Sequence, residues 1–336
     1  MWFVFLLFIV AIATDSQCPY VTTIEDRRLN TSTYRFVQYN VEWLFTDYYA
    51  SANCPGNGCP WENSTEAQTH LEYIKKVFET LEPDTMNICE VEGCDELNQL
   101  IQGIDSYKPY LIEGKDTSTG QNVGMISKID PQISLYRSEE RIEYPIPKST
   151  CNYTGESSTT GVSKHYITEI MINNIKTAII GTHLLAYPTD VLRCAEREAQ
   201  AQVIQNIIFH YIEKDFEIIL SGDFNDFDGD VLDVNNNRPI SSVLDILKGK
   251  AGIHINEYEM KTVGDKIQQT MRYSDWYDKN GNCKSVATEF SQIDHILTTP
   301  LLYNYIVQAF MYQSYDEYCG TYNSDHYPLV IDFFFL

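Results

Sequence analysis

Several short apolar segments of this chain are followed at once by residues that can bind a cation or move a proton. These residues are Asn40, Glu90, His183, Asp223 with Asn225, and Asp294 with His295, while Asp325 with His326 stands just before the last apolar segment. Carboxylate and carboxamide oxygens are the ligands that hard divalent ions prefer, and a histidine held by an aspartate can accept or donate a proton. Phosphodiester hydrolysis needs neutralised phosphate charge, an activated water and a stabilised leaving oxygen. The set predicts that chemistry.

The most informative segment is residues 218–225, Ile-Ile-Leu-Ser-Gly-Asp-Phe-Asn. An apolar, β-branched run of this length that stops at Ser-Gly predicts a buried strand leading into a loop. Side chains two residues apart in an extended chain point the same way, so Asp223 and Asn225 are expected to face one site. Gly222 would let another backbone or a ligand approach closely. The alternative is a strand followed by an Asp-rich turn over residues 225–230 with a structural or Ca²⁺-binding role.

The elements that must position these residues follow from hydrophobic periodicity. Helices are expected at 66–81, 95–104, 195–211 and 243–247, and strands at 35–41, 85–90, 123–127, 165–172, 175–181, 218–222, 292–297, 306–311 and 329–334. Residues 138–163 are expected to form a surface loop, and residues 259–289 a polar insertion. This order is neither a βαβ repeat nor an all-β pattern. It predicts two central sheets flanked by helices in one domain, residues 14–336.

The charge balance limits the classes of partner. The chain has 336 residues, with 24 Lys and Arg against 47 Asp and Glu, which gives a formal charge of −23. Binding to a nucleic-acid backbone through charge alone rests on Lys and Arg, so a tight polyanion binder is disfavoured. A phosphate substrate stays compatible with this surface if a divalent metal supplies local positive charge. An EF-hand is excluded because no Glu stands at the twelfth position counted from Asp223 or Asp226.

The first residues predict entry into the secretory pathway. Residues 1–13 are apolar and uncharged, too short to span a bilayer, and end in the small-x-small pattern Ala11-Ile12-Ala13. We therefore expect a signal peptide at 1–13, with an uncleaved anchor as the alternative. Glycosylation sequons begin at Asn30, Asn63 and Asn152. Location is expected to be extracellular or in the lumen of the secretory or endolysosomal pathway.

The chain has 9 cysteines, which are expected to be mostly disulfide-bonded in that pathway. Cys54 with Cys59, and Cys89 with Cys94, are local candidates for bridges. The odd count leaves at least one cysteine outside an intramolecular pair. Paired C-x-x-C motifs and nearby histidines at zinc-binding spacing are missing from the sequence.

The ordered motifs resemble those of the endonuclease/exonuclease/phosphatase superfamily, whose members are deoxyribonuclease I-like. The resemblance runs from about Tyr34 to the C-terminus, and its most specific motifs are Gly-Asp-Phe-Asn (222–225) and Ser-Asp-His-Tyr-Pro (324–328). Further support comes, in the same order, from Asn40, Cys-Glu-Val (89–91), Gly-Thr-His-Leu (181–184) and Ile-Asp-His-Ile (293–296). The resemblance implies a four-layer α/β/β/α sandwich with two central mixed sheets and the site at one rim of the sheets.

The resemblance also implies a metal site. Glu90 would be a direct ligand, and Asn40 would assist in placing the metal or the phosphate. Asp223 and Asn225 would position water and phosphate beside the metal, and Asp325 would hold water or a second metal. The implied cofactor is Mg²⁺, with Mn²⁺ and Ca²⁺ as alternatives.

The proton-transfer groups are implied in the same way. Asp294 would orient His326 as the acid/base, and His183 would contact the phosphate or serve as a second acid/base. The deoxyribonuclease branch gives its second histidine a carboxylate partner, whereas this chain has Gln121-Asn122 at the corresponding place. Arg272 would touch the substrate phosphate, with a surface-loop role as the alternative.

The expected activity is that of a secreted, Mg²⁺-dependent phosphodiesterase acting by attack of metal-activated water. Nucleic acid is the first candidate substrate, and sphingomyelin or inositol phosphates acted on by the same fold are the alternatives. A phosphodiester partner and no stable membrane span after signal cleavage are expected. An inactive binding module of this fold is disfavoured because the motif positions are filled.

Overall fold

A computed structural model describes Cys18, Val21 and residues 23–46, 60–313 and 323–335. The predicted signal peptide and Cys54, Cys59 and Cys319 lie outside these residues. Within the described part of the chain, no helix is both long and apolar enough to cross a bilayer.

The first sheet has six strands in the order β14-β15-β1-β2-β4-β3. Its strands are β14 (Ile306–Met311), β15 (Leu329–Phe334), β1 (Thr33–Leu44), β2 (Thr85–Val91), β4 (Asn122–Ser127) and β3 (Lys108–Leu111). β1 and β2 run parallel, and the other neighbours are antiparallel.

The second sheet has five strands in the order β10-β13-β9-β8-β7. They are β10 (Lys261–Thr262), β13 (Asp294–Thr298), β9 (Glu217–Asp223), β8 (Ile175–His183) and β7 (Lys164–Ile172). Only the β8–β9 pair in this sheet is parallel. A methyl group added at Gly222 would lie 1.8 Å from the Thr182 carbonyl oxygen, so glycine permits the close approach of β8 and β9.

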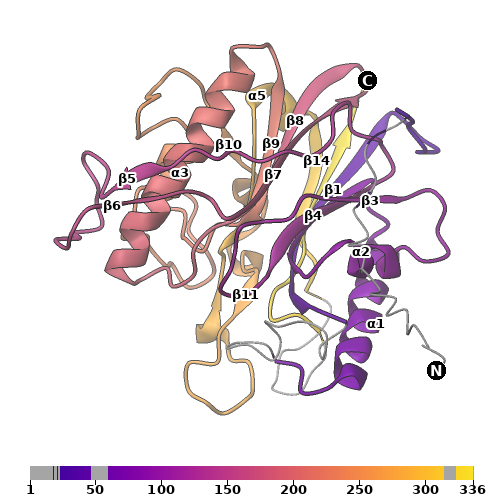
Figure 1. Cartoon of the computed structure of the whole chain (residues 1–336), viewed down its shortest axis with the longest axis horizontal. Helices are drawn as coiled ribbons and strands as arrows, with labels where there is room; N and C mark the ends of the chain where they lie inside the picture. Colours follow the sequence, from indigo (N-terminus) through magenta and orange to yellow (C-terminus); the bar gives the residue numbers. More distant parts are fainter. Residues whose placement is uncertain (1–17, 19–20, 22, 47–59, 314–322, 336) are drawn as a thin grey trace, which may run out of the picture.

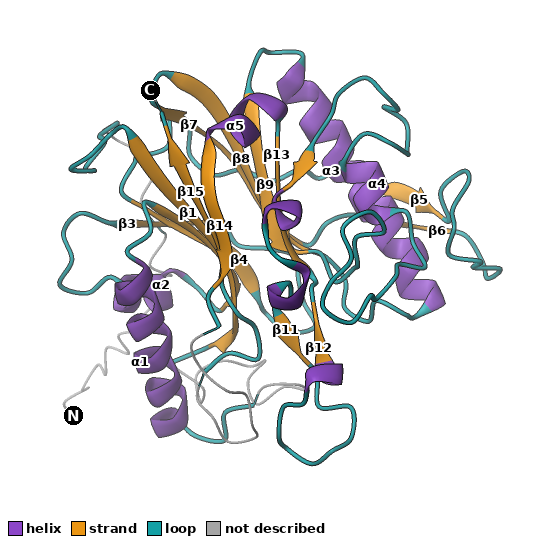
Figure 2. Cartoon of the chain, turned by 180° about the vertical axis from the view of Figure 1, so that it is seen from behind, coloured by secondary structure: helices purple, strands orange, loops and turns teal. Residues whose placement is uncertain are grey.

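Helices cover the outer faces of both sheets (Figures 1 and 2). α1 (Ser64–Leu81) and α2 (Cys94–Leu100) lie on the first sheet, while α3 (Val191–Ile212) and α4 (Val243–Leu247) lie against the second. A short helix, α5 (Pro300–Tyr305), joins β13 to β14. The four-layer α/β/β/α architecture expected from the sequence is confirmed.

The alternation of side chains along the strands separates the layers. Phe36 and Ile219 belong to the core between the sheets, whereas Val37 and Leu220 pack toward the helices. Because side chains in a strand alternate with period two, Gln38 and Asn40 share the inner face with Phe36. The polar residues of interest therefore lie at one end of an apolar core that both sheets enclose.

Small elements complete the chain. Two short hairpins form from β5 (Ile142–Tyr144) with β6 (Ser158–Thr160) and from β11 (Asp275–Trp276) with β12 (Phe290–Ser291). The first lies where a plain loop was expected, and the second lies mostly within the predicted polar insertion. Strand β3 was not expected, because a four-residue segment containing Pro109 gives little periodic signal.

Most of the cysteines that the structure describes are paired, as expected, but one predicted local bridge is wrong. Cys94 pairs with Cys18, whereas Cys89 is a buried free thiol, so Cys89 and Cys94 do not form a bridge. The reason is geometric: Cys89 faces the core between the sheets, whereas Cys94 begins α2 on the outer side. Cys151 pairs with Cys194, and Cys283 is also disulfide-bonded.

Candidate active site

A histidine–aspartate pair lies at the rim where the two sheets meet. The Nδ1 atom of His326 lies 2.6 Å from Oδ2 of Asp294, and both side chains are buried. The backbone N–H of His326 donates to Ser324 Oγ, which in turn donates to the carbonyl oxygen of Asn40. These bonds tie the loop before β15 to β1 at Asn40.

The carboxylate of Asp294 is itself fixed by hydrogen-bonded, buried side chains of the first sheet. Gln38 donates from Nε2 to Oδ1 of Asp294 at 3.0 Å, and Asn87 donates to the side-chain oxygen of Gln38. The backbone N–H of Asp294 donates to Ser274 Oγ at 3.0 Å. Sequence reasoning missed Gln38, although a polar residue between Phe36 and Asn40 on the inner face of a predicted strand was a signal of a buried polar role.

A second group of side chains surrounds the carboxamide of Asn40. Its Nδ2 donates to Glu90 Oε1 and to Asp223 Oδ2, at 3.1 Å each. Its Oδ1 accepts from the Glu42 backbone N–H at 3.1 Å, which fixes the orientation of the amide. Asn40 therefore holds the two carboxylates of the first and second sheets together.

Irregular backbone at the strand ends aims these side chains. Glu42, Trp43 and Glu90 have φ values of 49°, 52° and 68°, and the β1–β2 register shifts between Asn40 and Leu44. Positive φ is uncommon for residues other than glycine, and bulges re-aim side chains next to active sites. The N–H of Trp43 donates to Glu90 Oε2 at 3.2 Å, so the bulge also orients the Glu90 carboxylate.

His183, at the end of β8, faces the same carboxylates. Its Nε2 lies 3.5 Å from Asp223 Oδ2 and 3.9 Å from Glu90 Oε1. Burial, with added contributions from the charges of Lys164 and His326, holds the pKa of His183 well below its usual range. Lys164 pairs with His183 in the β7–β8 register and donates to Gln121 Oε1 at 3.1 Å. Gln121, one of the two residues at the place where the deoxyribonuclease branch has a carboxylate, thus accepts a hydrogen bond from Lys164.

Three further carboxylates surround the Nε2 atom of His326. Asp275 Oδ1 lies 3.7 Å away, Asp325 Oδ1 3.9 Å and Asp223 Oδ2 4.0 Å. Burial lowers the pKa of His326, but the charges of Asp294 and Asp325 outweigh it, so this pKa is raised well above its usual range. Sequence reasoning missed Asp275, which β11 brings into a bridge with His326.

The same crowding acts on the carboxylates. Burial, and then the neighbouring charge of Asp294, raises the pKa of Asp223 well above its usual range. Burial, together with the charges of Glu90, Asp275 and Asp294, raises the pKa of Asp325 to about 7. A divalent cation would relieve this concentration of negative charge.

Asn225 lies beyond the end of β9 and has φ 49°. The alternate-position argument from the sequence therefore does not apply to it, because the chain turns after Asp223. Its backbone N–H donates to Asp223 Oδ1 at 2.8 Å, and its Nδ2 donates to the Leu184 carbonyl oxygen at 3.2 Å. Asn225 thus links Asp223 to the loop that follows His183.

A fully buried arginine joins the two loops that follow His183 and Asn225. Arg197 of α3 donates from Nε to Asp226 Oδ2 at 3.2 Å, and its remaining nitrogens donate to the carbonyl oxygens of residues 185–188. Sequence reasoning missed Arg197, because a charged residue inside a helix gives no sign of burial.

Arg272 and the Asp-rich turn, for which the sequence left alternatives, both make contacts within the fold. Arg272 donates from Nη1 and Nη2 to the carbonyl oxygens of Leu232 and Ile267, and none of its hydrogen bonds joins it to the cluster around His326. In the Asp-rich turn, Asp226 pairs with Arg197, and Asp228 and Asp230 both pair with Lys248. These carboxylates are compensated by cationic side chains.

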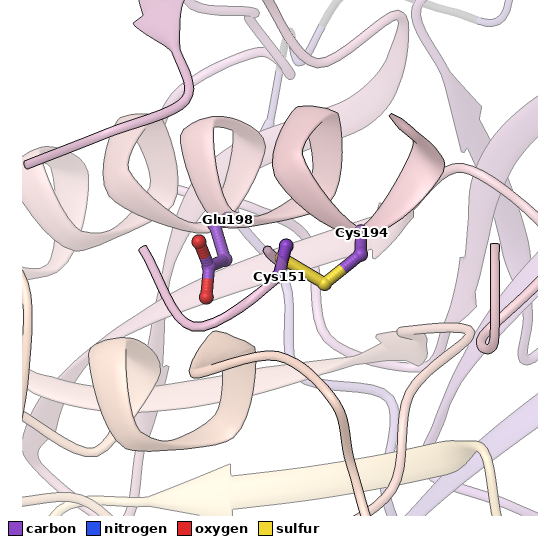
Figure 3. A group of neighbouring side chains, drawn as sticks. All are labelled: Cys151, Cys194 and Glu198. Atoms are coloured by element: carbon purple, nitrogen blue, oxygen red, sulfur yellow. A yellow bond between two sulfur atoms is a disulfide. The ribbon is translucent and has the colours of Figure 1, made fainter. Parts of the chain in front are cut away.

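Another group of potential metal ligands is formed by Cys194 and Glu198 of α3 with Cys151 from the loop between β5 and β6 (Figure 3). The two cysteines form a disulfide, which removes both thiolates. Oε1 of Glu198 accepts from Ser242 N–H at 2.8 Å and from Thr150 N–H at 3.2 Å. This group is a structural junction between α3, the start of α4 and residue 150.

The group formed by Glu90, His183 and Asp223 has different properties. Its ligand atoms lie within 4.8 Å of one another, and no lysine or arginine ion pair with Glu90 or Asp223 occurs in the described part of the chain. Carboxylate oxygens with an adjacent carboxamide are a donor set that suits Mg²⁺ or Mn²⁺. The residues present therefore fit a divalent metal. Asp325 is near the same cluster, because Nε2 of His326 lies 3.9 Å from Asp325 Oδ1 and 4.0 Å from Asp223 Oδ2.

Comparisons with known proteins agree with this arrangement at the level of fold. No family model matches the sequence, and no curated protein does. Truncated TDP2 from Caenorhabditis elegans is 15% identical, with 91% of this chain and 100% of that chain covered and a TM-score of 0.53. An endonuclease/exonuclease/phosphatase from Bacteroides vulgatus is 14% identical, covers 90% and 99% of the two chains, and has a TM-score of 0.54.

A third similar structure is D. rerio TDP2 in complex with a single-strand DNA product. It is 14% identical, with 90% of this chain and 99% of that chain covered and a TM-score of 0.52. At these identities the likeness establishes the fold, and the fold expected from the resemblance to the endonuclease/exonuclease/phosphatase superfamily is confirmed.

Proposed function

We propose that this chain, which has the fold of endonuclease/exonuclease/phosphatase proteins, is a secreted metal-dependent phosphodiesterase that hydrolyses nucleic acid. The observation that carries the proposal is the buried Asp294–His326 pair, with the Nδ1–Oδ2 distance of 2.6 Å, whose Nε2 faces a cluster of carboxylates. A catalytic dyad and a cation-binding cluster on one rim are the parts that phosphodiester hydrolysis requires.

Glu90 and Asp223 are the residues that would hold the metal, with Asn40 orienting both carboxylates and Asp325 nearby. A bound divalent cation supplies positive charge to the phosphate oxygens and lowers the pKa of water. The hydrogen bonds from Asn40 fix where these carboxylates point before substrate arrives, so the reorganisation needed during the reaction is small.

His326 is suited to hold a proton at Nε2. Asp294 fixes the ring through Nδ1 and stabilises its charged form, so Nε2–H can donate to a phosphate oxygen or to the leaving oxygen. Asp223, which Asn40 holds beside Glu90, would position the attacking water next to the metal. Asn225 orients Asp223 through its backbone N–H.

Nucleic acid is favoured as substrate because the D. rerio TDP2 structure with this fold contains a single-strand DNA product. The acidic character of this chain, −23, agrees with an enzyme that uses metal for charge neutralisation and releases its polyanion readily. Secretion is supported by the disulfides Cys18–Cys94 and Cys151–Cys194 and by the exposure of the sequon residues Asn30 and Asn152.

Plasmid nicking tests the proposal. Residues 14–336 are incubated with supercoiled DNA and Mg²⁺ or EDTA, beside His326→Ala and the matched control His210→Ala, an exposed histidine of α3. We expect Mg²⁺-dependent nicking that His326→Ala reduces by about 100-fold or more and that His210→Ala leaves intact. Folded, metal-binding protein that does not nick DNA would contradict a nucleic-acid substrate, and sphingomyelin and inositol phosphates would be assayed next.

A further inference from the structure

The imidazole of His183 is buried without a hydrogen bond at either nitrogen. Only 4% of the residue is exposed, and Nδ1 has no partner among the residues that the structure describes. The nearest acceptors around Nε2 are the two carboxylate oxygens at 3.5 and 3.9 Å, beyond hydrogen-bonding distance. Two other buried histidines have at least one bonded ring nitrogen: His165 contacts the Val162 carbonyl oxygen at 2.8 Å, and His295, whose Nδ1 also has no partner, contacts that of Asp226 through Nε2 at 2.9 Å.

The informative nitrogen is Nε2 and not the unpaired Nδ1, because a ring nitrogen that lies beside two carboxylate oxygens without a hydrogen bond calls for an explanation such as an ion or ligand. The direction of the ring indicates which. Nε2 faces Asp223 Oδ2 and Glu90 Oε1, and these are the same two oxygens that Asn40 brings together. Each of these oxygens accepts one hydrogen bond from Asn40 and keeps a second lone pair.

The spacing of His183 Nε2, Asp223 Oδ2 and Glu90 Oε1 suits one shared ion. Ligands held at about 2.1 Å from one metal lie roughly 3.0 Å apart at right angles and roughly 4.2 Å apart when opposite. The distances of 3.5 and 3.9 Å from Nε2 fall between these limits. The parallel pairing of β8 with β9, in which His183 lies opposite Asp223, keeps the nitrogen and the oxygen at this spacing.

We propose that His183 is a metal ligand through Nε2, completing with Glu90 and Asp223 a mixed nitrogen–oxygen site that favours Mn²⁺ and Zn²⁺ over Mg²⁺ and Ca²⁺. This inference concerns the metal site of the proposed function and assigns His183 a role different from contact with phosphate. Imidazole nitrogen suits transition metals, whereas Mg²⁺ and Ca²⁺ take oxygen ligands.

Electron spin-echo spectroscopy of the Mn²⁺-loaded full chain tests the assignment without substrate. Mn²⁺ at or below one equivalent is added to wild type, His183→Gln and His326→Gln. His326→Gln is the matched control, because it removes the other site imidazole, whose Nε2 lies 4.0 Å from Asp223 Oδ2. We expect ¹⁴N modulation from a directly bound imidazole in wild type and His326→Gln, and its loss in His183→Gln. Labelling wild type with ¹⁵N-histidine should replace the ¹⁴N modulation of the bound imidazole by that of ¹⁵N.

Calorimetric titration provides a second readout. The side-chain amide of glutamine offers an oxygen, so His183→Gln should still bind Mg²⁺ and Ca²⁺ while its affinity for Zn²⁺ falls by at least about tenfold. Wild-type protein that binds one Mn²⁺ without nitrogen modulation would overturn the proposal. Modulation that survives in His183→Gln and disappears in His326→Gln would overturn it as well.

The test separates this inference from the proposed activity. If the protein shows the His183-dependent signal but hydrolyses no phosphodiester, the proposed metal site is supported and the proposed function is contradicted. If the protein nicks DNA but lacks the signal, the proposed function is supported and the role of His183 as a metal ligand is contradicted. If His183→Gln does not fold, the ¹⁵N-labelled wild type together with His326→Gln still decides the identity of the nitrogen ligand.

Discussion

His326 and Asp294 are joined by a contact of 2.6 Å between Nδ1 and Oδ2, which leaves Nε2 of the ring directed at the rim of the two sheets. The aspartate comes from the second sheet and the histidine from the loop that enters the first. The pair therefore forms only when the sheets pack correctly. Its geometry is a property of the whole sandwich.

Gln38 is predicted to position this pair. Replacing Gln38 by Leu removes the hydrogen bond to Asp294 Oδ1 and leaves the Asn87 donor without its acceptor. We expect kcat for phosphodiester hydrolysis to fall by about 10- to 100-fold, the usual effect of losing a supporting contact, with KM little changed. Steady-state kinetics on a DNA oligonucleotide measure both.

The matched control for Gln38 is Gln205→Leu. Gln205 is a buried glutamine of α3 that donates to the carbonyl oxygens of Ile246 and Ala251, away from the rim. Its replacement should lower stability but leave kcat per folded molecule unchanged. Equal losses of kcat in both variants would show that Gln38 acts only through stability.

Arg197 is predicted to be the most costly charged residue to remove from α3. Arg197→Met leaves Asp226 buried without its cation and frees the carbonyl oxygens of residues 185–188. Breaking a buried pair in this way costs about 3–5 kcal/mol of unfolding free energy, which urea unfolding measures. Arg193→Met breaks the partly exposed Arg193–Glu196 pair on the same helix and should cost less than about 1 kcal/mol. Similar losses in the two variants would be incompatible with this account.

Acid should destabilise the fold through His165. Burial, and then the charge of Arg137, lowers the pKa of His165 to about 4, while Nε2 accepts from the Ser138 N–H. The unfolded chain, with a His pKa of about 6.5, binds more protons between these values. Stability is thus fully present above pH about 6.5 and falls as pH drops toward 4, by about 3 kcal/mol from this residue.

The measurement is urea unfolding of wild type and His165→Gln from pH 7 to pH 4. The difference in unfolding free energy between the two should shrink on acidification, because glutamine does not titrate. The exposed His210→Gln provides the comparison, and its difference from wild type should stay nearly constant. A pH-independent difference for His165→Gln would contradict the neutral, buried state of this ring.

Sequence reasoning located the rim residues because they follow strands, and strands are visible in a sequence through period-two burial. Asp223 and Asp294 lie opposite each other in the β9–β13 register, and His183 lies opposite Asp223 in the β8–β9 register. Which strands become neighbours depends on long-range pairing. The family resemblance predicted that these strand ends meet at one rim, which local periodicity could not predict.

The remaining parts depend on backbone and packing details that spacing does not encode. Glu90 reaches the site through a bulge with φ 68°, a conformation that glutamate rarely adopts. Arg197 looked like an ordinary surface residue of a helix, yet it is fully buried and hydrogen-bonded to the loops that follow His183 and Asn225. The Cys18–Cys94 bridge spans 76 residues, so neither partner could be identified by proximity in the sequence.

The most direct test of the central claim is a double-mutant cycle of phosphodiester hydrolysis on Asp294 and His326. Asp294→Asn, His326→Gln and the double variant are compared with wild type at saturating Mg²⁺, each shown to be folded and to bind Mn²⁺. If the two residues act as one unit, each single variant loses about 10²- to 10⁴-fold in kcat, and the double variant is hardly slower than the worse single one. Losses that multiply, or a His326→Gln variant with wild-type kcat, would contradict the account.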